Sequence, residues 1–114
     1  DHPLQSEGAS IPDTTCDDGA CSQDTASEWT NILTYGLGYR CDNVIGQDCD
    51  KSFSKPNFYK HFADRASKQY EQTIMSGIGS KSKEGTVSYK INIPGTQAQG
   101  IYSNIVTYIA VPNF

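Results

Sequence analysis

The feature that most constrains the fold is a regular alternation of apolar and polar residues in the last third of the chain. Every second side chain in the first part of this region is apolar: Val87, Tyr89, Ile91 and Ile93. A period of two predicts a β-strand with one apolar face. A turn is predicted across 94–100, which contains Pro and Gly. Residues 101–111, rich in Tyr, Val, Ile and Thr, then predict a second strand. A long closing hairpin of this kind is typical of a β-sandwich or barrel.

The same alternation predicts how this hairpin packs. The four apolar side chains of its first strand are expected to face the core, with Ile101, Ile105 and Ile109 on one side of the neighbouring strand. In that register Ile91→Ala costs about 2–5 kcal/mol of folding free energy, whereas Lys90→Ala stays within roughly 0.5 kcal/mol. A slip of one residue would exchange the two faces.

Length and charge limit the class of protein. The 114 residues predict a single domain over 1–114, with a polar, loop-rich part (1–34) and a strand-rich part (35–114). Nine basic residues against thirteen acidic ones give a net charge of −4, which argues against a nucleic-acid partner. The sequence lacks a run of eighteen apolar residues, so no membrane span is expected in this chain.

The four cysteines form two local pairs, and each pair flanks a segment of turn-forming residues. Four cysteines allow three connectivities, and we favour the local bonds Cys16–Cys21 and Cys41–Cys49. A zinc site is the alternative, but these spacings match the usual zinc motifs poorly. Disulfides in turn predict an oxidising compartment, outside the cell or at its surface.

The remaining segments give weaker expectations. At most one short strand is predicted near Leu4, and a single helical turn is considered from Asp24 to Trp29. A short strand is also predicted over 35–39. The glycines of this strand indicate a bulge or a close approach of backbones. Residues 40–57 are predicted to be a disulfide-closed loop and 76–85 a polar loop. Residues 58–75 have partial helical spacing, but we favour strand, loop and strand.

No catalytic motif is present, and we expect no enzymatic activity. His2 and His61 lie outside any metal-ligand spacing, and Asp64 with Glu71 is only a remote candidate for a carboxylate pair. No cofactor is expected. A bound calcium is an open alternative, because acidic residues cluster near both cysteine pairs: Asp13, Asp17, Asp18 and Asp24, then Asp42, Asp48 and Asp50. The alternative for these carboxylates is capping of backbone amides in solvated turns.

Several aromatic residues are candidates for a binding groove that holds a glycan or a peptide. The residues considered are Trp29, Tyr35, Tyr39, Phe58 and Tyr59. Such residues more often belong to a core or an interface, which is the interpretation that we favour.

In combination, four segments make the chain resemble a large group of exported, mostly uncharacterised surface proteins from ultra-small, reduced-genome bacteria. The resemblance spans the whole chain and implies a secreted or cell-surface β-sandwich without known enzymatic activity; it supplies no functional residues. In that group the Asp-His-Pro stretch follows several strands, so we expect that such strands were cut off here or are supplied by another molecule. The segments are DHPLQSEGASIPDTTCDDGAC, SEWTNILTYGLGYRCDNVIGQDC, FYKHFADRASKQYEQTIMSG and TVSYKINIPGTQAQGIYSNIVTYIAVPNF.

Together these observations predict an all-β, sandwich-like fold of antiparallel sheets with two short disulfide-closed loops. The function expected from them is that of an extracellular structural or assembly subunit, in the cell surface or in a surface filament. Its partner would be another copy of itself or another surface protein, joined through the edges of β-strands. The alternative is an adhesin-like module that binds a glycan or a host protein.

Overall fold

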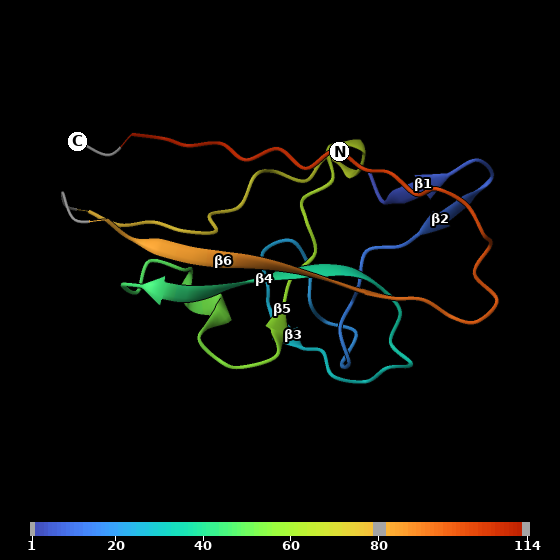
Figure 1. Ribbon diagram of the computed structural model, residues 1–114, viewed down its shortest axis with the longest axis horizontal. Coiled ribbons are helices and arrows are strands. Elements are labelled where there is room, and N and C mark those ends of the chain that lie inside the picture. The colour runs from blue at the N-terminus through green and yellow to red at the C-terminus, as the bar shows by residue number, and fades with distance from the viewer. Residues whose placement is uncertain (1, 79–81, 113–114) are drawn as a thin grey trace.

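The computed structural model describes residues 2–78 and 82–112, and it is built from β-strands and two short 3₁₀ turns (Figure 1). The strands form three antiparallel pairs, which confirms the predicted all-β fold of antiparallel sheets. In chain order the elements are β1 (Leu4–Ser6), β2 (Ala9–Ile11), β3 (Ser27–Glu28), β4 (Gly36–Ile45), η1 (Lys51–Phe53), β5 (Phe58–Tyr59), η2 (Arg65–Ser67) and β6 (Glu84–Asn92).

The long pair of β4 and β6 is the centre of the molecule. Its register runs from Gly36 opposite Asn92 to Ile45 opposite Glu84, with one irregularity between Asn43 and Ile45. The short pairs β1–β2 and β3–β5 lie beside it. Strand β4 is longer than the predicted strand over 35–39, because the residues that follow Tyr39 continue the same ladder.

Small cores occupy the two faces of this central pair. On one face, Tyr39, Cys41, Cys49 and Phe53 are buried together, and Val87 of β6 packs against them. On the other face, Trp29 is fully buried beside the Cys16–Cys21 disulfide. This second face requires glycine in β4: a Cβ atom on Gly38 would lie 2.7 Å from a Thr14 methyl group and 2.9 Å from the Trp29 ring. The close approach predicted from the glycines of this strand is therefore confirmed.

The closing hairpin has a different partner from the one predicted. Strand β6 pairs with β4, and residues 101–111 are extended but are not assigned to a strand. The chain turns away after β6 because other contacts hold it: the Gln97 side chain donates to the Ser10 carbonyl, and Ser103 exchanges two backbone hydrogen bonds with Gln5 of β1. In Figure 1 the C-terminal segment runs back alongside β6 without joining its sheet.

Four smaller expectations also need correction. Two strands, β1 and β2, form a hairpin where at most one was predicted. Asp24 does not begin a helical turn, since its carboxylate instead accepts hydrogen bonds from the Ser22 and Thr25 hydroxyls in a bend. In 58–75 the only strand is the two-residue β5, while Met75 makes a single bridge to Cys49; this segment is not an α-helix. Within the loop predicted over 76–85, residues 79–81 lie outside the described part, and β6 begins at Glu84.

Candidate functional site: a strand edge beside an apolar groove

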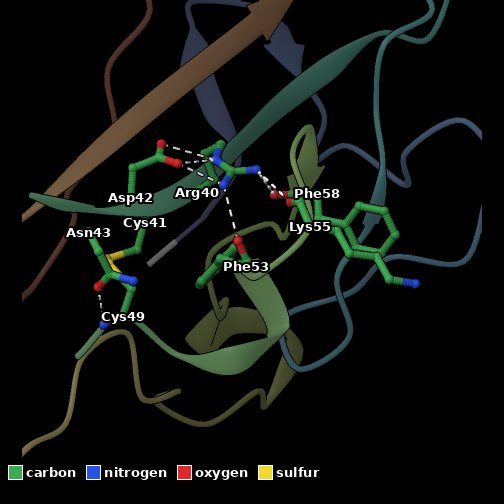
Figure 2. A network of polar contacts seen from close by, with 8 residues as sticks. All are labelled: Arg40, Cys41, Asp42, Asn43, Cys49, Phe53, Lys55 and Phe58. Atoms are coloured by element: carbon green, nitrogen blue, oxygen red, sulfur yellow. Dashed lines mark hydrogen bonds and ion pairs between the residues drawn. A yellow bond between two sulfur atoms is a disulfide. The ribbon is translucent and has the colours of Figure 1, made fainter. Parts of the chain in front are cut away.

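A buried arginine near the middle of β4 fastens a neighbouring loop to the central sheet (Figure 2). The Arg40 guanidinium makes a two-pronged contact with the Asp42 carboxylate, at 2.7 Å between Nη2 and Oδ1. Its remaining N–H groups donate to the carbonyls of Phe53, Lys55 and Phe58 at 3.1–3.2 Å. The planar fork of arginine satisfies several acceptors at once, so this one side chain holds residues 53–58 against β4. Sequence reasoning missed this role.

Both predicted disulfides are present. Cys16–Cys21 and Cys41–Cys49 each close a short loop. The second loop is fastened further by the Asn43 side chain, whose oxygen accepts a hydrogen bond of 2.8 Å from the Cys49 amide. The local connectivity inferred from turn-forming residues is therefore confirmed.

The five aromatic residues considered for ligand binding do not form one surface. Trp29 and Tyr39 are buried on opposite faces of the central sheet, and Tyr59 packs edge-on against Trp29 with ring centroids 5.4 Å apart. Tyr35 is partly exposed, at 39%. Phe58 is half-buried beside Lys55, in a shallow hollow of about 370 Å³. Most of this group therefore supports packing, as favoured above.

The outer edge of β6 is the most unusual feature of the described structure. On the other side of the sheet, β4 is covered: Leu37 exchanges hydrogen bonds with Pro12 and Thr14, and Tyr39 exchanges two with Lys60. The backbone groups of Leu37 and Tyr39 thus point away from β6. In an antiparallel ladder, residues opposite such positions also point their N–H and C=O groups outward.

Ile91 of β6 lies opposite Leu37, and Tyr89 lies opposite Tyr39. Because the outward direction recurs at every second residue, it also applies to Val87, which lies opposite Cys41. Their backbone groups therefore face away from β4. Within residues 2–78 and 82–112, β6 pairs with β4 alone. The strand consequently offers three outward amides and three outward carbonyls to another strand, and natural sheets usually cover or shorten such an edge.

The side chains of these three residues share one apolar face. Val87 packs on the core, but Tyr89 and Ile91 are 54% and 50% exposed, and Ile93 continues the face at 52%. The predicted alternation is thus correct, whereas the expectation that all four side chains face the core is wrong. Lys90 points to the opposite face, where its ammonium group lies 4.6 Å from the Trp29 ring centre and donates to the Trp29 carbonyl. Burial of this ammonium group lowers the pKa of Lys90.

An open groove adjoins this edge. It encloses about 1340 Å³ and is lined by Tyr39, Phe62 and Val87, by residues 68–77 and by residues 104–112. The Phe62 ring stacks on Tyr39 at 4.2 Å and contacts Tyr89 edge-on at 5.6 Å. Over the groove, the hydroxyl groups of Tyr89 and Tyr108 form a hydrogen bond. The volume exceeds the roughly 300–1,000 Å³ of small-molecule pockets and suits a segment of polypeptide.

The groove is largely uncharged. Its lining carries charged side chains at five positions, which are Asp13, Asp64, Arg65, Lys68 and Glu71. The ring of His61 lies 3.7 Å from the Asp13 carboxylate. Burial raises the pKa of Asp13 above its usual value and raises the pKa of Tyr39 to about 12. The pKa of Tyr108 is also raised, mainly by burial and by its hydrogen bond to Tyr89. The hydroxyl groups of Tyr39 and Tyr108 are therefore harder to deprotonate than that of a free tyrosine.

The acidic clusters bind backbone and hydroxyl groups. Asp17 accepts hydrogen bonds from the amides of Thr30 and Asn31, which lower the pKa of its carboxyl group. Asp50 caps η1 through the Ser52 amide. In the part of the chain that the structure describes, no three His, Cys, Asp or Glu side chains come together as a metal site.

Comparison with known proteins does not place the chain in a family. No family model, no curated protein and no solved structure matches it. Among the described residues, no helix is long and apolar enough to cross a membrane.

Proposed function

We propose that this protein is a structural subunit of an extracellular assembly, in a cell surface or a surface filament, and that it associates through the edges of β-strands. The observation that carries the proposal is the outer edge of β6, where Tyr89 and Ile91 combine outward backbone groups with exposed apolar side chains, and Val87 adds further outward backbone groups. Such an edge gains backbone hydrogen bonds and apolar burial from one added strand.

Two further observations support a place outside the cell. Both disulfides join buried cysteines, and bonds of this kind persist in oxidising compartments. A chain of this size with little apolar content, 36%, gains much of its stability from such cross-links, each contributing about 2 kcal/mol on the chain-entropy model.

The groove supports a polypeptide partner over a small ligand. It joins an open backbone edge to an apolar lining, which is the combination used when a strand adds to a sheet. In addition, the side-chain oxygen of Asn104 is buried in the groove lining without a hydrogen-bond partner in the described structure. An added strand could supply its N–H group, and buried acceptors are usually satisfied.

The test is sedimentation velocity over a wide range of protein concentration. We expect the wild-type chain to associate, and Ile91→Lys to remain monomeric because the charge sits on the apolar edge face. Ser88→Lys is the matched control, since it places the same charge on the same strand at an exposed position of the opposite face. A wild-type chain that stays monomeric at every concentration would overturn the proposal, as would equal behaviour of the two variants.

The adhesin-like alternative rests on the hollow beside Phe58. Its lining combines an aromatic ring with lysines and hydroxyl groups, including Lys51, Lys55 and Ser52, a mixture that suits an acidic glycan. Binding of an acidic oligosaccharide that is lost in Phe58→Ala and retained in Ile91→Lys would favour this function over assembly.

A further inference from the structure

The C-terminal segment has one anchored end. Ser103 is held by its two backbone hydrogen bonds with Gln5, and Tyr102 is held by hydrogen bonds with Gln97 and Ala98. Beyond this anchor, residues 104–112 are extended and are not assigned to a strand. We call residues 104–112 the tail.

The tail is partly buried near its anchor and largely exposed beyond it. Asn104 and Val106 are half-buried toward the groove, and Tyr108 meets Tyr89 there. The alternate residues carry β-branched side chains that are largely exposed, including Ile109 at 58% and Val111 at 80%. An extended segment with β-branched residues at alternate positions has the composition of a strand, and in the single molecule the side chains of Ile109 and Val111 are largely exposed.

The tail matches the edge of β6 in length and in charge. It contains nine residues, as does β6, so an extended tail spans about 30 Å beside a strand of equal length. From Ile91 to Pro112 the sequence has no charged residue, and the groove beside β6 is largely neutral as described above. An uncharged segment such as the tail loses little hydration on entering a lining of this kind.

The anchor explains why the tail does not pair with β6 of its own chain. After β6 the chain first reaches β1, where Ser103 is tied, and it returns along a path displaced from the β6 edge (Figure 1). The geometry of a single molecule thus keeps a strand-like segment apart from an edge that it fits. A second copy is free of this restriction.

We propose that the tail of one copy adds to the outer edge of β6 in a second copy, with its exposed β-branched face on the apolar face of that sheet. This inference rests on the proposed function. It identifies the partner as a second copy of the chain and the added strand as the tail of that copy. When a tail leaves its own groove, the hydrogen bond between Tyr89 and Tyr108 is released, and the Tyr89 side chain on the apolar face of β6 can contact an incoming tail. Donating a tail therefore extends the apolar face that the same molecule offers to another copy.

The test uses complementary variants of the full chain. Ile109→Lys disables the donor face, and Ile91→Lys disables the acceptor edge. Gln99→Lys is the control, because it places the same charge at an exposed position that lies outside the tail and outside the groove lining. Urea unfolding of each dilute variant verifies that it is folded.

We expect each disabled variant to be monomeric alone, the control to associate like the wild type, and an equal mixture of the two disabled variants to form a one-to-one complex. Ile109→Lys that assembles like the wild type would overturn the inference and leave the proposed edge association standing. A mixture that stays monomeric would also overturn it. A monomeric wild type would overturn both proposals.

A peptide provides a second measurement that does not depend on how the tail variants fold. A labelled peptide with the sequence of residues 101–112 is titrated into the Ile109→Lys chain. We expect saturable binding that is reduced at least tenfold when the peptide itself carries Lys at position 109. Absence of saturable binding, or equal binding of the two peptides, would contradict the proposed donor.

Discussion

At the scale of single residues, stability depends on a few polar side chains that satisfy buried backbone groups. Arg40 is 9% exposed and serves one carboxylate and three carbonyls. Lys60, 3% exposed, lies 3.7 Å from the Asp50 carboxylate. Since the apolar core is small, such contacts carry a large share of the structural specificity. A buried donor or acceptor that loses its partner costs about 1–3 kcal/mol.

We expect Arg40→Lys to lower the free energy of unfolding by about 2–4 kcal/mol in a urea titration, because one ammonium group cannot replace the planar fork. The matched control is the reverse exchange at the exposed Lys51, since Lys51→Arg should stay within roughly 0.5 kcal/mol. Similar midpoints for Arg40→Lys and the wild type would mean that Arg40 does not hold residues 53–58 in place.

At the scale of elements, β6 has a polar face that is packed and an apolar face that is half bare. Lys90 lies over Trp29, and Ile91 lies on the exposed face. This arrangement reverses the usual relation between hydrophobicity and burial along a strand. It also reverses the effects expected from the sequence for the two substitutions.

In dilute monomer we expect Lys90→Ala to cost about 1–2 kcal/mol, because it removes a cation–π contact and a charged hydrogen bond. Ile91→Ala should cost less than about 1.5 kcal/mol there, since half of that side chain is already in water. Chemical denaturation of both variants at low concentration measures the difference. A loss of 2–5 kcal/mol for Ile91→Ala alone would indicate that the apolar face is covered within the monomer.

The sequence predicted local features well and distant partners poorly. The two disulfides could be predicted because turn-forming residues separate nearby cysteines. The two faces of residues 87–93 could be predicted because apolar and polar side chains alternate there. The partner of β6 could not be predicted in this way, because the paired residues of β4 lie 39 to 56 positions earlier in the chain and neither strand carries a local signal for the other. Residues 101–111 have the composition of a strand, but contacts at Gln97 and Ser103 set their path. The β6 edge could be found only once its partner was known.

At the scale of the whole molecule, the chain is less compact than its length allows. Its radius of gyration is 15.1 Å, against about 13 Å for a compact domain of this length. Fifteen large apolar side chains are exposed by more than a third among the described residues, and those of β6 and the tail lie beside the groove. A second layer over this face, supplied by association, would bury them and complete the sheet.

Amide hydrogen exchange in β6 tests this account most directly. Ser88 and Lys90 lie opposite Arg40 and Gly38 and direct their amides to β4, so they should be protected at every concentration. The outward amides of Val87, Tyr89 and Ile91 should exchange quickly in dilute solution and become protected when the protein associates. Protection of these three amides in the dilute monomer, or fast exchange in the assembled state, would contradict an open edge that recruits a strand.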